Sequence, residues 1–523
     1  MISALTHSVR LLRANYVFAR EGVFSDVDPT LLPFPARVGL RLGRLIERPS
    51  KASHAGRLAA ALTQLGPTYV KLGQFLATRP DVVGPMVAQE LESLQDRMPP
   101  FPQAEAIATI ERAFGRPLKE VFVSLGPAVA AASIAQVHRA EVQTNEGPKE
   151  VAVKVLRPGV ERRFKIDQDA FAFAARTAES FSPEAQRLRL VETAATMRRS
   201  VALEMDLRLE AAALSEMAEN TKDDPDFRVP TVDWDRTAKE VLTLEWIDGT
   251  HLSNRAALEA KGYDLKQLAR AVIQSFLRHA LRDGFFHADM HPGNLFVDGA
   301  GKIVAVDFGI MGRLGVKERR FLAEILYGFI TRNYRRTAEV HFEAGYVPSH
   351  HSVDDFAQAI RAIGEPIHKR AADEISMAKL LMLLFEVTGL FDMRTRPELL
   401  LLQKTMVVVE GVARSLDPKL DMWTTAEPVV REWIERHLGP VGRVAGAVEG
   451  TMEVGRFMGQ VPGLLSRGAV LIEQLDAATR NGIVLSPETV ANIGRAEARR
   501  SRWTAIALWV IAALLVYIVY LIK

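Results

Sequence analysis

The chain has 523 residues, of which 48% are hydrophobic and 25% are charged, so it can bury more than one hydrophobic core. The formal net charge is only +3, and no basic run interleaved with aromatic residues occurs, so the composition predicts no nucleic-acid partner. Cysteine is absent, which excludes disulfide bonds, thiolate zinc sites and a cysteine nucleophile.

The first 115 residues predict a helical extension. Helical spacing separates the apolar residues Ile2, Leu5, Val9, Leu12 and Tyr16, and arginines lie between and after them. This amphipathic pattern is typical of a helix packed on the protein's own core or of a helix lying on a membrane surface. Pairs of glycine and proline, such as Gly66-Pro67, then divide the extension into several helices.

Residues 116–250 predict a small lobe rich in β-structure. Runs of β-branched residues indicate strands at 121–126, 133–142 and 150–156, and the connection between the first two is GPAVAAAS, residues 126–133. In the third strand, alternation with period two places Ala152 and Lys154 on one face and three valines on the other. Helices over about 160–220 and a strand over 241–249 complete the lobe.

The segment HADMHPGN, residues 287–294, allows two interpretations. As a metal site it is incomplete, because Pro292 prevents a helix that would join the two histidines and no third ligand has suitable spacing. As a catalytic loop it has the expected companions. Asn294 follows Asp289 by five residues, and an Asp-Phe-Gly motif begins at Asp307, beyond a short strand pair around residues 299–301. With Lys154 upstream, the order of these motifs favours phosphoryl transfer.

The acidic stretch EMDLRLE, residues 204–210, lies within the predicted helices. Asp206 and Glu210 are four residues apart, so they share a helix face and need a cation between them. Lys154 is that cation in our interpretation, with Glu210 as its partner. Glu204 lies on another face, where Arg208 could neutralise it locally.

The C-terminal half predicts a helical lobe over residues 251–500, followed by a membrane span. Residues 504–522 contain nineteen residues without a charge, enough to cross the hydrocarbon layer of a bilayer. Four arginines precede this span and one lysine follows it, which predicts a single-pass C-terminal anchor with the catalytic part on the cytoplasmic side. In a bacterium this would be the inner membrane.

Together these elements predict an α+β, two-lobed protein-kinase-like fold with an N-terminal helical extension and a C-terminal helical region ending in a transmembrane helix. Three departures from ordinary kinases accompany it. Alanines 130–132 stand where a glycine-rich phosphate loop is expected, so this loop should be stiffer. Alanine occupies position 288, and only a few residues follow Gly309 before the next helical pattern. The sequence therefore argues against phosphorylation of protein substrates.

The chain resembles the UbiB family of atypical, kinase-like ATPases, which is linked to ubiquinone biosynthesis. The resemblance covers about residues 60–312. It is carried by LGPTYVKLGQFLATRPD (65–81), ELESLQDRMPPF (90–101), the alanine-rich loop with SIAQVHRA, VAVK, the EMD stretch, HADMHPGN and VDFG.

The resemblance implies site residues that spacing alone does not show. The Lys-x-Gly-Gln segment, with Lys71 and Gln74, would fold over the active site in the place of a protein substrate and meet Glu204 and Asp206. ATP would be contacted by the alanine-rich loop, by the third strand and by backbone groups of the hinge strand: Ala130, Ala131, Ala132, Ser133, Ala152, Lys154, Glu245 and Ile247.

These observations predict a membrane-anchored ATPase that uses ATP and Mg²⁺ to handle quinone precursors. Lys154 would position the phosphates, Glu210 would orient Lys154, and Asn294 and Asp307 would hold the metal. Asp289 would orient or deprotonate the attacking group. A nucleotide-binding scaffold for quinone-biosynthetic enzymes and a kinase for a lipid or phenol remain as alternatives. Expected partners are membrane lipids, quinone precursors and other enzymes of the pathway, and a homodimer stays open.

Overall fold

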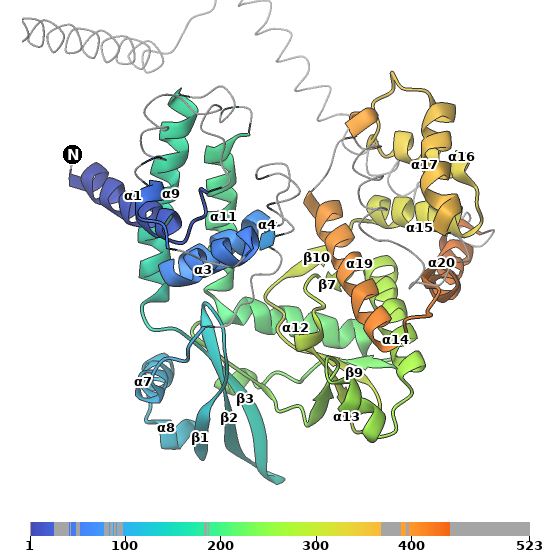
Figure 1. Ribbon diagram of the computed structural model, residues 1–523. Coiled ribbons are helices and arrows are strands. Elements are labelled where there is room, and N and C mark those ends of the chain that lie inside the picture. The colour runs from blue at the N-terminus through green and yellow to red at the C-terminus, as the bar shows by residue number, and fades with distance from the viewer. Residues whose placement is uncertain are drawn as a thin grey trace, which may run out of the picture. The chain divides into compact units, whose positions relative to one another are not determined.

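The computed structural model describes residues 2–25, 41, 43–48, 53–77, 83, 87, 90–91, 98–181, 186, 188–367, 387, 389–393 and 397–439. Contacts divide the chain into two units, Met1–Ile434 and Glu435–Lys523. The first unit contains nearly every described element (Figure 1), and the second is described only at the end of one helix.

A four-stranded antiparallel sheet forms the β-rich part of the first unit. In spatial order its strands are β1 (Ser124–Ala131), β2 (Ala135–Thr144), β3 (Gly147–Leu156) and β5 (Val241–Glu245). The turn between β2 and β3 falls at Asn145-Glu146, and Gly147 adopts a φ of 116° that favours glycine.

The alternation predicted for β3 is confirmed. Val151, Val153 and Val155 are buried, and they pack in one apolar cluster with Ala106 and Ile110 of helix α7. Ala152 and Lys154 lie on the opposite face and are half-buried. Two helices stand beside this sheet: α7 (Gln103–Phe114) and α8 (Leu118–Val121).

Three helices of the N-terminal extension pack with two helices that follow β3, as Figure 1 shows. The three are α1 (Ile2–Arg20), α3 (His54–Leu65) and α4 (Pro67–Ala77), and the two are α9 (Val160–Phe181) and α11 (Leu190–Glu204). Asp167 of α9 joins three of them, because it accepts hydrogen bonds from Arg10 Nη1 of α1 (2.6 Å) and from Thr68 Oγ1 of α4 (2.8 Å). Tyr69 of α4 also packs edge-on against Phe171 of α9.

The rest of the unit is mainly helical. It begins with α12 (Leu207–Thr221) and contains two small sheets, ordered β4-β9-β8-β6 and β10-β7. The strands are β4 (Phe227–Arg228), β6 (Gly249–His251), β7 (Phe285–His287), β8 (Leu295–Asp298), β9 (Ile303–Ala305) and β10 (Met311–Arg313). The helices are α13 (Arg255–Ala260), α14 (Leu265–Arg278), α15 (Val316–Ile330), α16 (Tyr334–Glu343), α17 (Val353–Ile367), α19 (Pro397–Leu416) and α20 (Met422–Leu438), with short helical turns at Trp234–Arg236, His279–Asp283 and Pro292–Asn294.

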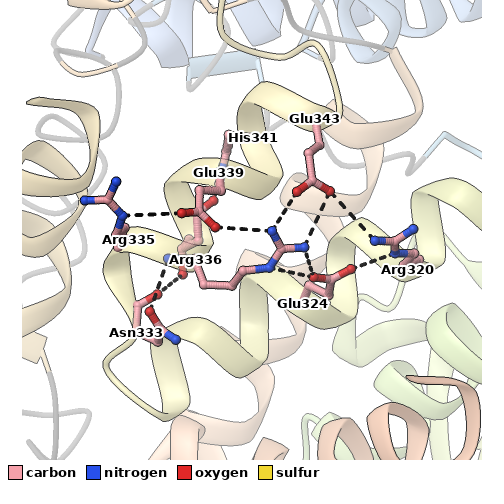
Figure 2. Close-up of polar contacts among 9 residues, drawn as sticks. Arg320, Glu324, Asn333, Arg335, Arg336, Glu339, His341 and Glu343 are labelled. Carbon is pink, nitrogen blue, oxygen red and sulfur yellow. Dashed lines mark hydrogen bonds and ion pairs between the residues drawn. The ribbon is translucent and has the colours of Figure 1, made fainter. Parts of the chain in front are cut away.

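A network of charged side chains joins α15 to α16, as Figure 2 shows. The carboxylate of Glu324, only 8% exposed, accepts hydrogen bonds from Arg320 Nε (2.7 Å) and from Arg336 Nε (3.0 Å). Arg336 also reaches Glu343 (2.6 Å) and Glu339 (3.3 Å) on its own helix. A carboxylate removed from water in this way needs both guanidinium groups, so Glu324 is the centre of the network.

Two predictions about the β-rich part need correction. The predicted loop over residues 126–133 is mostly strand, because Gly126–Ala131 belong to β1 and pair with β2, which leaves a connection of three residues at 132–134. The predicted start of the first strand is instead the short helix α8 and an extended residue. Alanine is a poor strand former, but its small side chain allows the close pairing that β2 supplies.

The helix predicted at the N-terminus is present as α1, but several of the apolar residues identified in the sequence do not pack against its neighbours. Ala14 and Val17 are buried toward the neighbouring helices, whereas Val9 and Leu12 are 58% and 67% exposed. Tyr16 is also exposed. The apolar series that we identified in the sequence therefore includes residues that point away from the core.

Among the described residues, no helix is both long and apolar enough to cross a bilayer. The span predicted at residues 504–522 lies outside the described residues.

The network in Figure 2 predicts different effects for two carboxylates of similar chemistry. We expect Glu324→Gln to lower the free energy of unfolding by about 1–2 kcal/mol, because it leaves two arginines facing a neutral group. The matched control Glu339→Gln, at a more exposed position in the same network, should cost less than about 0.5 kcal/mol. Urea unfolding of the purified variants measures both values, and equal effects would contradict this assignment.

Candidate active site

The side chain of Lys154 lies between two carboxylates. Its Nζ donates hydrogen bonds to Glu210 Oε1 (2.8 Å) and Oε2 (3.0 Å), and to Asp307 Oδ1 (2.8 Å). Lys154 comes from β3, Glu210 from the first turn of α12, and Asp307 from the segment after β9. The ion pair that the sequence predicts between Lys154 and Glu210 is therefore present.

Glu210 connects this lysine to the Asp-Phe-Gly motif. Besides the ammonium of Lys154, its Oε1 accepts a hydrogen bond from the backbone N–H of Phe308 (3.2 Å). The Glu210 side chain is 7% exposed, so its negative charge depends on these donors. Any movement of α12 would therefore change the position of both Lys154 and the motif.

The three charges shift one another's pKa. Burial would lower the pKa of Lys154, but the charges of Asp307 and Glu210 outweigh it and raise that pKa. The charge of Lys154 holds the pKa of Asp307 below its usual range. Burial raises the pKa of Glu210, and the Lys154 ammonium opposes that rise. Because the Asp307 side chain is 48% exposed, water screens part of this attraction.

Asp307 adopts a strained backbone conformation. Its φ is 63°, a region that residues other than glycine rarely occupy. Strain of this kind persists where the surrounding contacts impose it, and here they include the Lys154 hydrogen bond and the tie from Phe308 to Glu210. The carboxylate of Asp307 is thereby held at the site while staying open to solvent.

The segment HADMHPGN forms a compact loop after β7. Asn294 Nδ2 donates to the backbone oxygen and to Oδ2 of Asp289, both at 3.1 Å. The backbone N–H of Val306 donates to the Asn294 carbonyl (2.9 Å), which places the residue before Asp307 against this loop. The loop thus brings Asp289, Asn294 and the Asp-Phe-Gly segment together.

The two histidines of this loop have separate structural contacts. His287 is 1% exposed; its Nε2 donates to the Val306 carbonyl (3.2 Å), and its Nδ1 accepts from the Asp289 backbone N–H (3.0 Å). His291 is exposed, and its Nδ1 accepts from the Gly293 backbone N–H (3.2 Å) at the start of a short helical turn. Both histidines thus form hydrogen bonds with backbone groups of the loop. The geometry therefore favours the catalytic-loop interpretation over the metal site.

The three-residue turn after β1 is tied down by side chains that the sequence did not reveal. Arg157 donates to the carbonyls of Ala132 (2.9 Å) and Pro99 (2.8 Å). Gln136 accepts from the backbone N–H of Phe101 (2.9 Å) and contacts the buried His138 (2.9 Å). Arg157 therefore holds the turn itself, and Gln136 holds the beginning of β2 next to it. No local pattern could indicate them, because Gln136 and Phe101 are 35 residues apart.

The four predicted nucleotide contacts in this region, Ala130, Ala131, Ala132 and Ser133, therefore lie in different settings. Ala130 and Ala131 pair with β2, at Val137 and Gln136, while Ala132 and the buried Ser133 lie in the turn. At the hinge, the Glu245 backbone N–H donates to the Thr231 carbonyl (2.9 Å), and Ile247 lies in the irregular connection to β6.

Helix α4 brings a second lysine to the site. Lys71 Nζ lies 2.5 Å from Glu204 Oε2, with side chains 13% and 9% exposed. Lys71 also lies close enough to Asp307 to contribute to the lowering of its pKa. The acidic partner implied for Lys71 is therefore Glu204, at the end of α11. Gln74, three residues further along α4, is half-buried.

Asp206 has a different role from the one implied for it. It is the N-cap of α12, where its Oδ1 accepts from the Arg208 backbone N–H (3.1 Å), and its carboxylate binds the Arg208 guanidinium (2.7 and 2.9 Å). Our expectation that Arg208 would neutralise Glu204 is wrong. Helix α11 ends at Glu204 and α12 begins at Leu207, so Arg208 pairs with the N-cap Asp206 of its own helix and Glu204 faces Lys71.

The Lys71–Glu204 pair predicts that substitutions of the two residues have non-additive effects on the free energy of unfolding. Lys71→Met should lower the free energy of unfolding by about 2–4 kcal/mol, because it leaves a buried carboxylate unpaired. The double variant with Glu204→Gln should recover about 1–3 kcal/mol of the summed loss. The exposed pair Lys239–Glu161 is the matched control, and its coupling should stay below about 0.5 kcal/mol. Additive effects at Lys71 and Glu204 in urea unfolding would contradict the pairing.

Tyr69, two residues before Lys71, predicts a pH dependence of this region. Burial and the charge of Asp167 raise its pKa to about 12. Since the unfolded pKa is about 10, the contribution of Tyr69 to stability is present below pH 10 and is lost as pH rises toward 12. In an absorbance titration of phenolate, we expect one late-titrating tyrosine that disappears in Tyr69→Phe. If Tyr69→Phe instead removes a tyrosine that titrates near pH 10, Tyr69 is not buried as the structure places it.

Comparisons with known proteins agree with this geometry. A family model described as the ABC1 atypical kinase-like domain matches residues 93–341, and one described as the UbiB helical domain matches residues 360–421. The structure of Rv3197 with erythromycin from Mycobacterium tuberculosis matches with a TM-score of 0.51 at 24% identity, covering 76% of this chain and 98% of that one. The kinase-like α+β fold predicted from the sequence is therefore supported.

Curated relatives extend the likeness over most of the chain. A probable protein kinase UbiB from Marinobacter nauticus is 39% identical over 447 residues, covering 84% of this chain and 81% of the relative. Its counterpart from Azotobacter vinelandii is 39% identical over 443 residues, covering 82% and 81%. At this identity and coverage, the chain belongs to the UbiB family of atypical kinase-like proteins.

Proposed function

We propose that this protein is an ATP- and Mg²⁺-dependent ATPase that supports ubiquinone biosynthesis at a membrane. The observation that carries the proposal is the position of Lys154 between Glu210 and Asp307. A structural protein has no need to keep a charged lysine, a buried glutamate and a solvent-open aspartate together, whereas phosphoryl transfer uses all three.

The residues present fit a nucleotide with a divalent metal. Asp307 offers a solvent-open carboxylate, and Asn294 faces Asp289 with its Nδ2, so the amide oxygen of Asn294 remains for a metal. Oxygen ligands of this kind are those that Mg²⁺ prefers. When bound, Mg²⁺ would neutralise the negative charge that develops on the phosphoryl oxygens. Ala152 and the backbone of Ile247 would contact the adenine.

The side chains of the site would have separate roles in phosphoryl transfer. Lys154, oriented by Glu210, would hold the phosphates of the nucleotide, because its ammonium stays charged at neutral pH. Asp289, held by the Asn294 amide, would orient or deprotonate the attacking water molecule, or a substrate hydroxyl in the kinase alternative. The fixed turn at Ala132 and Ser133 would place backbone groups near the phosphates without the mobility of a glycine-rich loop.

Hydrolysis is favoured over protein phosphorylation by three features of the site. Only residues 310–315 separate Gly309 from α15, and three of them form β10, so little chain is left to bind a peptide. Ala288 is buried, its N–H donates to the Ile310 carbonyl, and its carbonyl accepts from Thr405 Oγ1. Helix α4, through Lys71, also brings the N-terminal extension close to Asp307.

The membrane part of the proposal has separate support. The sequence predicts a single-pass anchor at residues 504–522 with the catalytic part cytoplasmic, and relatives at 39% identity carry the name UbiB. An ATPase anchored there would act on membrane lipids or quinone precursors, alone, as a homodimer or with other biosynthetic enzymes. The alternatives are a nucleotide-binding scaffold and a kinase that phosphorylates a lipid or phenol.

The proposal predicts the effect of one substitution on ATP turnover. In full-length protein reconstituted in lipid, Asp307→Asn should lower the rate of ADP release roughly 100-fold or more, because it removes a metal ligand. The matched control Asp248→Asn, at an exposed position after β5, should leave the rate unchanged. Hydrogen exchange on both variants would verify that the fold is intact.

The products of the same reaction distinguish the alternatives. ATP hydrolysis predicts one inorganic phosphate for each ADP. A phosphorylated lipid or phenol formed in amounts equal to ADP would favour the small-molecule kinase. Tight nucleotide binding with no turnover in wild type would favour the scaffold.

A further inference from the structure

We propose that His350, His351 and Asp392 form a binding site for a divalent transition metal ion, with Zn²⁺ as the preferred occupant. The three residues lie outside the candidate active site: the histidines precede α17, and Asp392 follows the helical segment at residues 389–390. Their ligand atoms all lie within 4.8 Å of one another. Among the residues that the structure describes, they are the one group of three or more potential metal ligands.

His351 contacts Asp392 directly, and the distances among the three ligand atoms are also compatible with a shared metal ion. His351 Nε2 lies 3.2 Å from Asp392 Oδ2, and His350 Nε2 lies 3.8 Å from the same oxygen. Two ligands on a tetrahedral Zn²⁺, with bonds of about 2.0–2.2 Å, are separated by roughly 3.4 Å. Rotations of the exposed His350 and Asp392 side chains would bring their ligand atoms to His351 at the spacing that one ion needs. Two imidazole nitrogens and one carboxylate oxygen leave a fourth position for water.

In the described part of the chain, the polar partners of Asp392 are themselves potential metal ligands. Within the described part of the chain, no lysine or arginine forms an ion pair with Asp392, and both recorded partners are histidines. The two imidazole rings lie side by side, with centroids 4.1 Å apart. A single metal ion would bind both imidazole nitrogens and the carboxylate oxygen at once.

The site is held from behind by an apolar cluster. The His351 ring packs on Phe391 (centroids 5.3 Å apart), and Phe391 packs on Phe356 (4.9 Å). Phe391 and Phe356 are 6% and 1% exposed. The backbone that carries Asp392 is therefore fixed by its neighbour, and the backbone that carries the histidines is fixed by α17, so the ligands are positioned before any metal arrives.

Such a metal would link residues that lie far apart in the sequence. His351 and Asp392 are 41 residues apart, and the segment between them contains α17 and part of the UbiB helical domain match. Because the three ligands come together only in the folded chain, a metal bound there stabilises the folded state by mass action. We expect the metal to stabilise this helical region, independently of nucleotide.

The test is a Zn²⁺ titration of the full-length protein with every affinity tag removed. Millimolar Mg²⁺ is kept present, so that sites built from oxygen ligands stay occupied. A competing chromophoric chelator reports the affinity, and Co²⁺ reports the ligand geometry by its visible absorption. We expect one equivalent of Zn²⁺ whose affinity falls at least about tenfold in Asp392→Asn and in His351→Gln. The control His437→Gln, at an exposed position in α20, should bind like wild type.

Hydrogen exchange gives a second readout. Zn²⁺ should slow exchange in α17 of wild type and leave α17 of the Asp392→Asn variant unchanged. No saturable binding at micromolar Zn²⁺, or binding that all three variants retain, would overturn the proposal. Because ATP turnover enters neither measurement, failure here would not bear on the proposed ATPase function.

Discussion

The ammonium of Lys154 is the group on which the rest of the site depends. It is 13% exposed and contacts Glu210 and Asp307 at once, so a lysine that burial would neutralise stays charged. Its two partners come from parts of the chain that are 97 residues apart. Glu210 then reaches the Phe308 backbone, and Asp307 takes a strained conformation beside it. One cation therefore sets the relative positions of β3, α12 and the Asp-Phe-Gly segment.

A second lysine repeats this arrangement from the N-terminal extension. Lys71 binds Glu204 within 2.5 Å, and its charge reaches Asp307. Helix α4 is itself held by the buried Asp167, which binds Arg10 and Thr68. The extension is therefore linked to the site through charges that are costly to separate once removed from water. This dependence explains physically why helices before the kinase-like part would matter for chemistry within it.

The sequence predicts those features that depend on local periodicity or on motif order. Alternation in β3 identifies the face of Lys154, and the spacing from Asp289 to Asn294 and Asp307 identifies the loop. It fails where tertiary contacts override local preference. Pairing with β2 turns an alanine-rich segment into strand, and a break before α12 makes Asp206 a cap. The ties from Arg157 and Gln136 join distant residues, which no local pattern encodes.

The central claim is that the Lys154–Asp307 constellation performs chemistry that ubiquinone biosynthesis requires. The most direct measurement is the ubiquinone content of cells that lack this gene and are complemented with wild type or with Asp307→Asn at matched protein levels. Our account predicts that wild type restores ubiquinone and that Asp307→Asn does not. Equal restoration by both would contradict it, because the metal ligand would then be dispensable and the protein would act as a scaffold.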